Sequence, residues 1–396
     1  MKNLSYLTLP IIIVLLAFTG IKPRPIKDVI NESLDFSVKQ YALMAKLLKE
    51  KKDSLPRSTE PNGKILLTTS RNWTSGFFPG SLWYLYEATG DNKIKEDAQL
   101  FTARIEKEKF VKTTHDLGFI LYCSFGNGLR LSQQPEYAEI MLTGANSLIT
   151  RYNPKIGLIK SWDNRKWPYP VIIDNMMNLE FLMWATRYTK DSTYFKIAVS
   201  HADNTMKNHY RPDFSCYHVV AYDTVNIGKI TIKQNHQGLA DESAWSRGQS
   251  WGLYGYTMMY RETGYERYLQ QAKNIAKFLI NHPNLPSDKV PYWDYNVTSK
   301  DEPRDASAAA VMASALVELS QYVDKKTAKK YLEVAEAQIR SLSSPAYLAD
   351  LGTNNNYLLK HSVGSKAHNS EVDVPLIYAD YYYLEAMLRY KKLLNK

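Results

Sequence analysis

The sequence contains little cysteine, with only Cys123 and Cys216 among its 396 residues. Two cysteines cannot form a disulfide framework or a four-thiolate zinc site. There is also no His-x-x-x-His pair and no Gly-x-x-x-x-Gly-Lys loop, patterns that hold metal ions and nucleotide phosphates. After the first twenty residues, no apolar run is long enough to span a bilayer. These absences argue against metal-dependent and nucleotide-dependent chemistry.

Positive charge exceeds negative charge, and the formal net charge is +10 at pH 7. A basic protein attracts nucleic acid, a membrane surface or an acidic ligand. Much of the excess lies in short stretches at 49–52, 325–330 and 391–396, and none of them alternates basic with aromatic residues as a nucleic-acid surface does. We therefore expect no nucleic-acid partner. The charge is compatible with an acidic substrate without identifying it.

The first twenty residues form a segment of their own. Lys2 precedes a mostly apolar run at 7–18, which two small residues follow. A run of about 12 residues is too short to span a bilayer comfortably and matches the core of an export signal. We expect a signal peptide at 1–20, a single catalytic domain at 21–396 and a periplasmic location. The alternative is that the segment is kept as a membrane anchor.

Strand signals are sparse, and most of the chain shows helical periodicity with short polar breaks. Each break separates two amphipathic segments and so predicts a helical hairpin; the breaks lie at 89–91, 133–135, 189–191, 263–264 and 324–325. Further helices near 36–49 and 378–394 bring the expected number to about twelve. Twelve helices in six hairpins form either an open α-solenoid or a closed α/α toroid.

Long segments between the hairpins favour the closed form, because long ordered loops usually carry function. The fold class that we expect is therefore all-α, an (α/α)6 barrel or six-hairpin toroid with long loops. Within one of these loops, residues 216–232 alternate with β-branched side chains and predict a small β-hairpin.

Two aspartates at expected helix starts are the candidate catalytic residues. Asp116 precedes the apolar segment that begins at Leu117, and Asp174 precedes the helix expected from Leu179. Aspartate is a favoured N-cap residue, so both could serve only as caps. In a toroid, however, equivalent helix starts meet at one end of the central cavity. Asp174 and Asn178 are also four residues apart, which places them on one helix face.

Aromatic and hydrogen-bonding groups gather in two further segments. Trp73 stands before a glycine-rich helix start, where an exposed indole would support the apolar face of a sugar; packing in the core is the alternative. His236 and Gln237 are followed by the segment containing Trp245 and Arg247. A planar guanidinium beside indoles suits a carboxylate or a sulfate, although Arg247 could also be a structural arginine stacked on tryptophan.

Seven motifs, in order along residues 70–390, give the chain a close resemblance to glycoside hydrolase family 88, the unsaturated glucuronyl hydrolases. They read GFFPGSLW (76–83), HDLGF (115–119), IDNMMNLE (173–180), SRGQSWGLYG (246–255), YWDY (292–295), RDASAAA (304–310) and SEVDVPLIYADYYYLEA (370–386). The resemblance implies an (α/α)6 barrel, in agreement with the hairpins, and no metal or organic cofactor.

The resemblance also implies an activity. Members of the family remove a non-reducing-end 4,5-unsaturated glucuronic acid from oligosaccharides that polysaccharide lyases produce, by hydrating the C4=C5 enol ether. It implies that Asp174 is the proton donor and then the base, that Asp116 assists, and that the substrate is held by Trp73, His115, His218, Gln237, Trp245 and Arg247. A helix start lowers the pKa of Asp174. We expect its apolar neighbours, Asp116 and the substrate carboxylate to raise that pKa again.

Three other readings stay open at this point. A related family acts on unsaturated rhamnogalacturonan fragments with the same chemistry, a toroid of this kind could bind sugars without catalysis, and a lyase would create the double bond instead of consuming it. Near the C-terminus, Lys366 and His368 would favour a sulfated sugar such as a glycosaminoglycan fragment. The sequence gives no indication of the oligomeric state.

Overall fold

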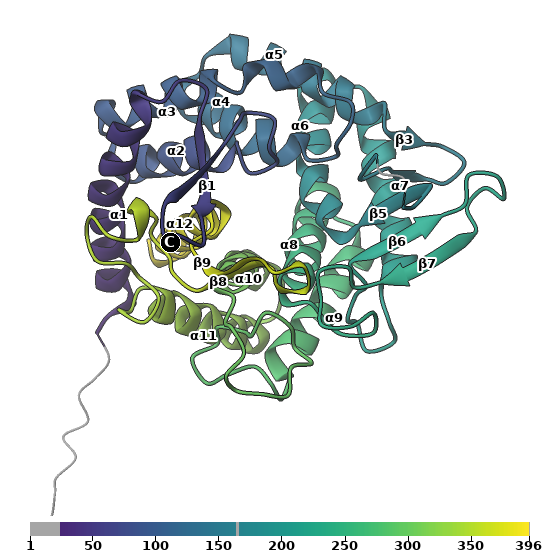
Figure 1. Cartoon of the computed structure of the whole chain (residues 1–396). Helices are drawn as coiled ribbons and strands as arrows, with labels where there is room; N and C mark the ends of the chain where they lie inside the picture. Colours follow the sequence, from purple (N-terminus) through teal and green to yellow (C-terminus); the bar gives the residue numbers. More distant parts are fainter. Residues whose placement is uncertain (1–23, 164–165, 396) are drawn as a thin grey trace, which may run out of the picture.

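The computed structural model describes residues 24–163 and 166–395, so the signal peptide expected at 1–20 lies outside the described residues. Paired α-helices form a closed ring in this part of the chain (Figure 1). The outer helices are α1 (Ile26–Lys49), α3 (Asn92–Ala103), α5 (Pro135–Ile149), α7 (Ser192–His209), α9 (Glu266–Asn281) and α11 (Lys325–Leu342). The inner helices are α2 (Phe77–Thr89), α4 (Asn127–Ser132), α6 (Leu179–Thr189), α8 (Ser246–Thr263), α10 (Ala306–Leu319) and α12 (Ile377–Leu394). The expected (α/α)6 barrel is therefore confirmed.

All five predicted breaks separate an inner helix from the next outer helix, and local backbone chemistry explains them. Gly90 ends α2 with φ +72°, a left-handed conformation that glycine adopts without strain. The Asp91 carboxylate then accepts a hydrogen bond of 2.8 Å from the Lys93 amide and caps α3. Lys190 and Asp191 form the same pair of signals between α6 and α7. A helix stop followed at once by a helix start forces the chain to reverse.

The sixth pair joins the two ends of the described chain. The inner helix α12 packs against α1, so the last helix closes the ring on the first. Buried groups hold this closure together: the Tyr41 hydroxyl of α1 donates to Asp380 of α12 at 3.0 Å, and the amides of Leu358 and Leu359 donate to the same carboxylate at 2.8 and 2.9 Å. No local signal could predict this pairing, because its members lie more than 300 residues apart.

Short antiparallel sheets decorate the ring. The hairpin expected at 216–232 is confirmed as β6 (Val219–Tyr222) and β7 (Ile230–Gln234), and β5 (Tyr169–Ile172) pairs with β6 to give a three-stranded sheet. The other pairs, which the sequence did not predict, are β1 (Leu55–Thr59) with β2 (Ile65–Thr68), β3 (Tyr152–Asn153) with β4 (Leu158–Ile159), and β8 (Ser362–Ser365) with β9 (Ser370–Val374). The β5–β7 sheet lies beside the ring, whereas β8 and β9 lie over its centre in Figure 1.

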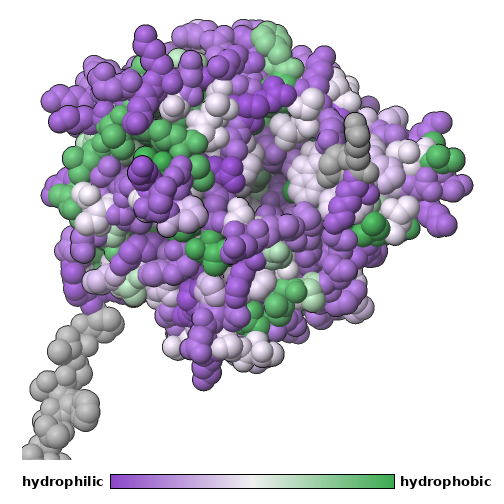
Figure 2. All heavy atoms as spheres, viewed as in Figure 1, coloured by the Kyte–Doolittle hydropathy of each residue, from purple (hydrophilic) through white to green (hydrophobic). Residues whose placement is uncertain are grey.

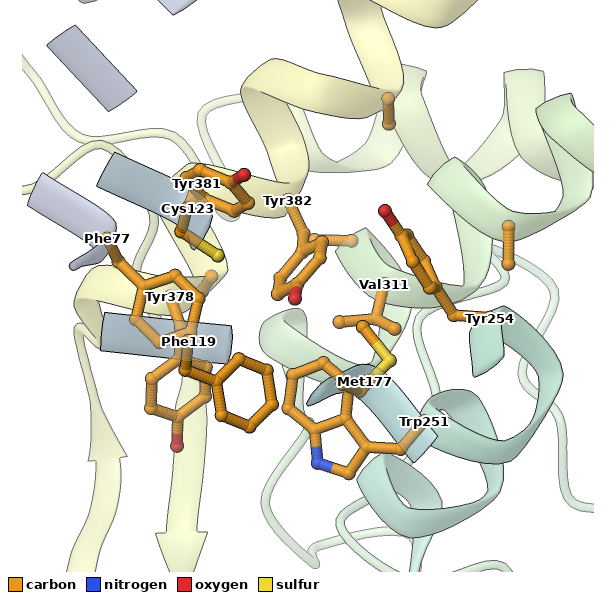
Figure 3. Close-up of a cluster of buried hydrophobic side chains, with 14 of the residues drawn as sticks. Phe77, Phe119, Cys123, Met177, Trp251, Tyr254, Val311, Tyr378, Tyr381 and Tyr382 are labelled. Carbon is orange, nitrogen blue, oxygen red and sulfur yellow. The ribbon is translucent and has the colours of Figure 1, made fainter. Parts of the chain in front are cut away.

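The barrel axis is filled by aromatic side chains from the inner helices (Figure 3). Phe119, Trp251, Tyr378 and Tyr382 meet there, with ring centroids of Phe119 and Trp251 5.5 Å apart and those of Trp251 and Tyr382 5.3 Å apart. Such rings bury large areas and prefer the tilted arrangements seen here. These four rings, here called the aromatic plug, close the central cavity at mid-height. Open space is therefore confined to the two ends of the cavity. Within the described residues, no helix has the length and apolarity needed to cross a membrane.

Closure of the ring through Asp380 predicts a pH dependence of stability. Burial raises the pKa of Asp380 to about 7, against the effect of its three hydrogen-bond donors. The folded state therefore binds a proton more tightly than the unfolded chain does between pH 4 and 7. In that window this group destabilises the fold by about 1.4 kcal/mol for each pH unit gained. Denaturant unfolding of the protein and of Asp380→Asn between pH 5 and 7 should show this slope in their difference, whereas parallel profiles would contradict it.

Candidate active site

Both candidate aspartates lie where inner segments of the ring begin. Asp116 precedes a π-helix (Gly118–Gly126) that leads into α4, and Asp174 lies in a short 3-10 helix (Ile173–Asn178) that leads into α6. Neither segment has a side-chain cap, so both aspartates are free of the capping role that the sequence left open. By contrast Asp305, at the start of α10, accepts hydrogen bonds from the Ser307 and Ala308 amides. Asp116 and Asp174 therefore do not serve as helix caps.

His115 brings the two carboxylates together. Its Nε2 lies 3.2 Å from Asp116 Oδ1, and the charges of both Asp116 and Asp174 act on its ring. Burial lowers the pKa of His115, with the two carboxylates opposing that effect. The Thr114 hydroxyl donates to Asp116 Oδ2 at 2.5 Å and fixes the orientation of that carboxylate. The sequence predicted that the two acids share one mouth of the ring; it did not predict that both would act on one buried imidazole.

Asp174 is paired with a second histidine. Its Oδ2 lies 3.5 Å from Nε2 of His218, which stands just before β6. Burial alone would raise the pKa of Asp174, but the hydrogen bond and charge of His218, followed by the charges of His115 and Arg247, hold it below its ordinary value. The pKa of Asp174 is therefore lowered in the free protein. The expected rise, which includes the effect of the substrate carboxylate, stays a prediction for the complex.

The shared helix face expected for Asp174 and Asn178 is wrong. The segment is a 3-10 helix with about three residues per turn, so residues four apart point in different directions. Instead, Asn178 Oδ1 accepts a hydrogen bond of 3.0 Å from the Phe119 amide. This bond ties the segment that carries Asp174 to the one that carries Asp116. Gly118 makes their close approach feasible, because a Cβ there would lie 2.8 Å from Asn178 Cα.

Aromatic rings form one wall of the mouth. The indole of Trp245 lies 4.7 Å from the His218 ring, and Trp162 packs edge-on to His218 at 5.8 Å. His236 lies 5.9 Å from Trp162, and burial lowers its pKa to about 4. The sequence analysis missed Trp162 as a site residue and noted His236 only as part of a segment. Trp162 reaches the site through an isolated β-bridge with Thr114. This contact exists only in the tertiary fold, so no local sequence pattern reveals it.

Trp73 and Gln237 are placed differently from each other. Trp73 is half-buried before α2 and packs on Tyr378 at 4.8 Å and on Phe119 at 5.5 Å, so it is anchored in the aromatic plug at the mouth. Gln237 is half-buried in the loop after β7, beside His236. In Figure 3, Tyr381 and Tyr254 lie at one end of the aromatic plug. The Tyr378 hydroxyl and the Trp251 nitrogen point toward the opposite end. Figure 2 shows a hollow at the centre of this face of the ring.

Arg247 has the structural role that the sequence left open, whereas its role in binding an anion stays a prediction. Its guanidinium lies over the Trp245 ring at 4.5 Å, yet its nitrogens donate to Asp305 Oδ2 at 3.3 Å, to the Gly364 carbonyl at 2.7 Å and to the Val363 carbonyl. It is 2% exposed and clamps β8 onto the starts of α8 and α10. Of the nitrogens of the Arg247 guanidinium, Nε has no hydrogen-bond partner. Arg247 is thus a structural clamp whose charge also faces the carboxylates.

Two other chemistries would need a nucleophilic serine or a cluster of metal ligands. A Gly-x-Ser-x-Gly pattern occurs at 248–252, the spacing of a serine-hydrolase nucleophile elbow. Ser250, however, is buried within α8 and donates to the carbonyls of Ser246 and Ala308 instead of standing on a strand-to-helix turn. In residues 24–163 and 166–395, no three His, Cys, Asp or Glu side chains are grouped so that they could hold a metal ion.

A closed ring of helical hairpins with two carboxylates, two imidazoles and indoles at one mouth defines a carbohydrate-active enzyme of the (α/α)6-barrel class. The protein belongs to glycosyl hydrolase family 88, whose model matches residues 43–392. The unsaturated glucuronyl hydrolase of Formosa agariphila is 48% identical over 351 residues, which make up 87% of this chain and 86% of that protein. The unsaturated chondroitin disaccharide hydrolase of Streptococcus pyogenes serotype M1 is 33% identical over 375 residues, 92% of this chain and 91% of the relative.

A crystal structure of an unsaturated glucuronyl hydrolase specific for heparin has a TM-score of 0.90 and 47% identity, covering 93% of this chain and 99% of the other. These likenesses confirm the family, the fold and the enzyme class expected from the sequence, an unsaturated glucuronyl hydrolase. The roles of individual site residues stay predictions, which the geometry of the mouth supports.

Proposed function

We propose that the protein removes the non-reducing-end 4,5-unsaturated glucuronic acid from lyase-generated glycosaminoglycan oligosaccharides. The observation that carries the proposal is the convergence of Asp116 and Asp174 on His115, at the mouth lined by Trp162, Trp245 and His218. The indoles offer flat apolar surfaces to sugar rings. The imidazoles and the charge of Arg247 suit an anionic ring. The names of the similar proteins, which act on chondroitin or heparin fragments, point to the same substrate class.

The proposed chemistry begins with transfer of a proton from Asp174 to C4 of the enol ether. Positive charge with oxocarbenium character develops at C5, and the water that adds there gives its proton back to Asp174. The carboxyl group is thereby restored, the hemiketal opens and the glycosidic linkage collapses. Asp116, held by Thr114 and His115, orients the reacting groups and stabilises the developing charge. Besides the chain and the substrate, these steps consume one water molecule, which adds at C5.

Protonation of Asp174 must follow substrate binding. In the free protein its pKa is lowered by His218, His115 and Arg247, so the carboxyl is ionised at neutral pH. A substrate carboxylate placed beside Asp174 adds a second negative charge and displaces water, and both effects favour the neutral acid. The proton is therefore retained by the site only when the anionic ring is present.

A spectrophotometric assay tests the proposed activity. Unsaturated uronides absorb in the near ultraviolet, and hydration of the double bond removes the absorbance. Incubation with lyase-generated chondroitin or heparin disaccharides should bleach the band. An unchanged band would mean a sugar-binding protein, and a band that grows on intact polysaccharide would mean a lyase. Unsaturated rhamnogalacturonan disaccharides should react much more slowly.

We further propose a preference for sulfated sugars through the β8–β9 hairpin. The ring of His368 lies 4.4 Å from that of His236, which reaches the catalytic wall, and Ser365 Oγ lies 2.7 Å from His368 Nδ1. Lys366 forms an ion pair with Glu302, so its ammonium is shared between that carboxylate and any bound anion. The same hairpin therefore carries one cation and one imidazole beside the mouth.

Replacing Lys366 by methionine should lower kcat/KM for a sulfated disaccharide by about tenfold, the worth of one charge-assisted hydrogen bond. The rate on the unsulfated disaccharide should change less than twofold. Lys360→Met provides a matched control, because the Lys360 ammonium donates to the Pro345 carbonyl instead of facing Glu302. Equal losses on both substrates would show that Lys366 maintains the hairpin instead of reading the sulfate.

Export of the chain is also proposed, from the apolar run at 7–18 that Lys2 precedes. The N-terminal sequence of protein recovered from the periplasm of a producing cell would test it. A chain that still begins at Met1 in the membrane fraction would indicate an anchor.

A further inference from the structure

A second cavity lies at the end of the ring opposite the catalytic mouth. It has a volume of about 450 Å³ and is lined by residues from the later turns of inner helices, including Glu87, Arg130, Trp184 and Arg389. The catalytic groups stand at the beginnings of inner segments, so helix polarity places these residues at the other end. Neither Asp116 nor Asp174 lines this cavity. The volume lies within the ordinary range for small-molecule sites.

The wall of the cavity is rich in phenols and has an indole at its side. Tyr84 and Tyr254 donate hydrogen bonds to Glu385 at 2.8 and 3.1 Å, and the Tyr381 hydroxyl lies 3.1 Å from that of Tyr84. Trp184 is half-buried between two nearly parallel rings, those of Tyr188 (centroids 5.2 Å apart, planes 13° apart) and Phe181 (6.2 Å, 19°). A fixed indole beside several hydroxyl groups is a combination that suits the apolar face and the hydroxyls of a sugar.

Charges around the cavity are balanced. The lining contains Glu87, Glu180 and Glu385 together with Arg130, Arg389 and Lys392. Glu87 pairs with both Arg130 and Lys392 at 2.7 Å, Glu385 with Arg389 at 3.4 Å, and Glu180 with the neighbouring Arg261. A ligand with a net charge would have to break these pairs. The catalytic mouth, by contrast, gathers imidazoles and a guanidinium for an anion.

The aromatic plug separates this cavity from the catalytic mouth but is thin. Figure 3 shows Tyr254 and Tyr381 with their hydroxyls directed away from the side where the Tyr378 hydroxyl and the Trp251 nitrogen point. Met177, which lines the cavity, is three residues from Asp174 in the same 3-10 helix, and Gly118 is two residues from Asp116. A ligand in the cavity would therefore touch the segments that carry both carboxylates.

We propose that this cavity is a second carbohydrate site, which binds one neutral sugar unit independently of the catalytic mouth. Its platform is Trp184, and its hydrogen-bonding wall is the set of phenols around Glu385. The proposal does not depend on the reaction at the other end of the ring, because it rests on the cavity alone.

Ligand-observed NMR with methyl β-glucoside and methyl β-glucuronide tests the proposal, since the two probes differ only in charge at C6. The glucoside should bind saturably, and an unsaturated disaccharide bound to an inactive Asp174→Asn variant should not displace it. With the mouth of the Asp174→Asn variant filled by the unsaturated disaccharide, the glucuronide should bind no more tightly than the glucoside. Trp184→Ala should weaken glucoside binding by about tenfold, the upper range for an aromatic contact, and Trp184→Phe should restore most of it.

Phe110→Ala is the control for loss of an aromatic ring, because Phe110 is exposed and does not line the cavity. Its affinity for the glucoside should stay within twofold of the unchanged protein. Absence of saturable binding, displacement by the unsaturated disaccharide, or equal loss in the Trp184→Ala and Phe110→Ala variants would each overturn the proposal. Tighter binding of the glucuronide would overturn the assignment of a neutral ligand.

Discussion

Replacing Asp174 by asparagine is expected to lower kcat on unsaturated disaccharides by about ten thousandfold, the upper range for loss of a general acid–base group. The amide cannot give a proton to C4 or take one from water, so both halves of the proposed reaction stop. Binding should be largely kept, because asparagine has the same shape and the His218 imidazole can adapt its tautomer to the amide. The absorbance assay gives kcat, and calorimetric titration of the variant gives the dissociation constant.

Asp91→Asn is the control for that experiment. Asp91 is exposed and only caps α3, a role that asparagine fills equally well, so activity should be unchanged. A variant at Asp174 that retains more than a few per cent of the rate would remove this residue from the mechanism. A variant that no longer binds the disaccharide would assign Asp174 to substrate recognition.

The pH dependence of kcat should reflect the protonation state of Asp174. Since Asp174 must be protonated in the enzyme–substrate complex, kcat is expected to fall as the pH rises. His218, His115 and Arg247 lower its pKa in the free protein, so the apparent pKa in kcat should lie above the value that NMR titration gives for the free carboxyl. Equal values would mean that the substrate carboxylate does not supply the shift.

Much of the fold could be predicted from the sequence because the ring is built from local signals. The pairs Gly90–Asp91 and Lys190–Asp191 stop one helix and start the next within two residues, so they mark hairpins directly. The closure of α12 on α1 and the β8–β9 hairpin depend on partners far away in the chain, such as Asp380 with Tyr41 and Arg57 with Glu371. Contacts of that kind leave no periodic pattern.

The candidate site also has parts that the sequence predicts and parts that depend on distant contacts. Asp116 and Asp174 were found because equivalent helix starts converge in a ring, which is a rule of topology. The geometry around them was not predicted, because it is made by tertiary neighbours. Trp162 reaches the mouth through its bridge to Thr114, and His218 opposes the effect of burial on the pKa of Asp174. Arg247 was named correctly as a residue of this region, but its partners Val363 and Gly364 lie more than 110 positions away.

Arg247→Ala is expected to destabilise the fold by about 3–5 kcal/mol, as removal of one partner from a buried ion pair does. The variant would leave Asp305, which is fully buried, without its cation and two carbonyls of β8 without their donor. Asp305 keeps its capping bonds to the Ser307 and Ala308 amides, so the loss should lie nearer the lower figure. Denaturant unfolding followed by circular dichroism measures it.

The comparison with Arg267→Ala isolates the effect of burial. Arg267 forms a bidentate pair with Asp203, but its side chain is 42% exposed, so this variant should lose no more than about 1 kcal/mol. The double variant Arg247→Ala with Asp305→Asn should recover part of the stability, because no buried charge is then left unpaired. Activity separates the two roles of Arg247. An arginine that also holds the uronate predicts that KM of the double variant stays raised about tenfold or more after the stability has recovered. A purely structural clamp predicts that KM recovers together with the stability.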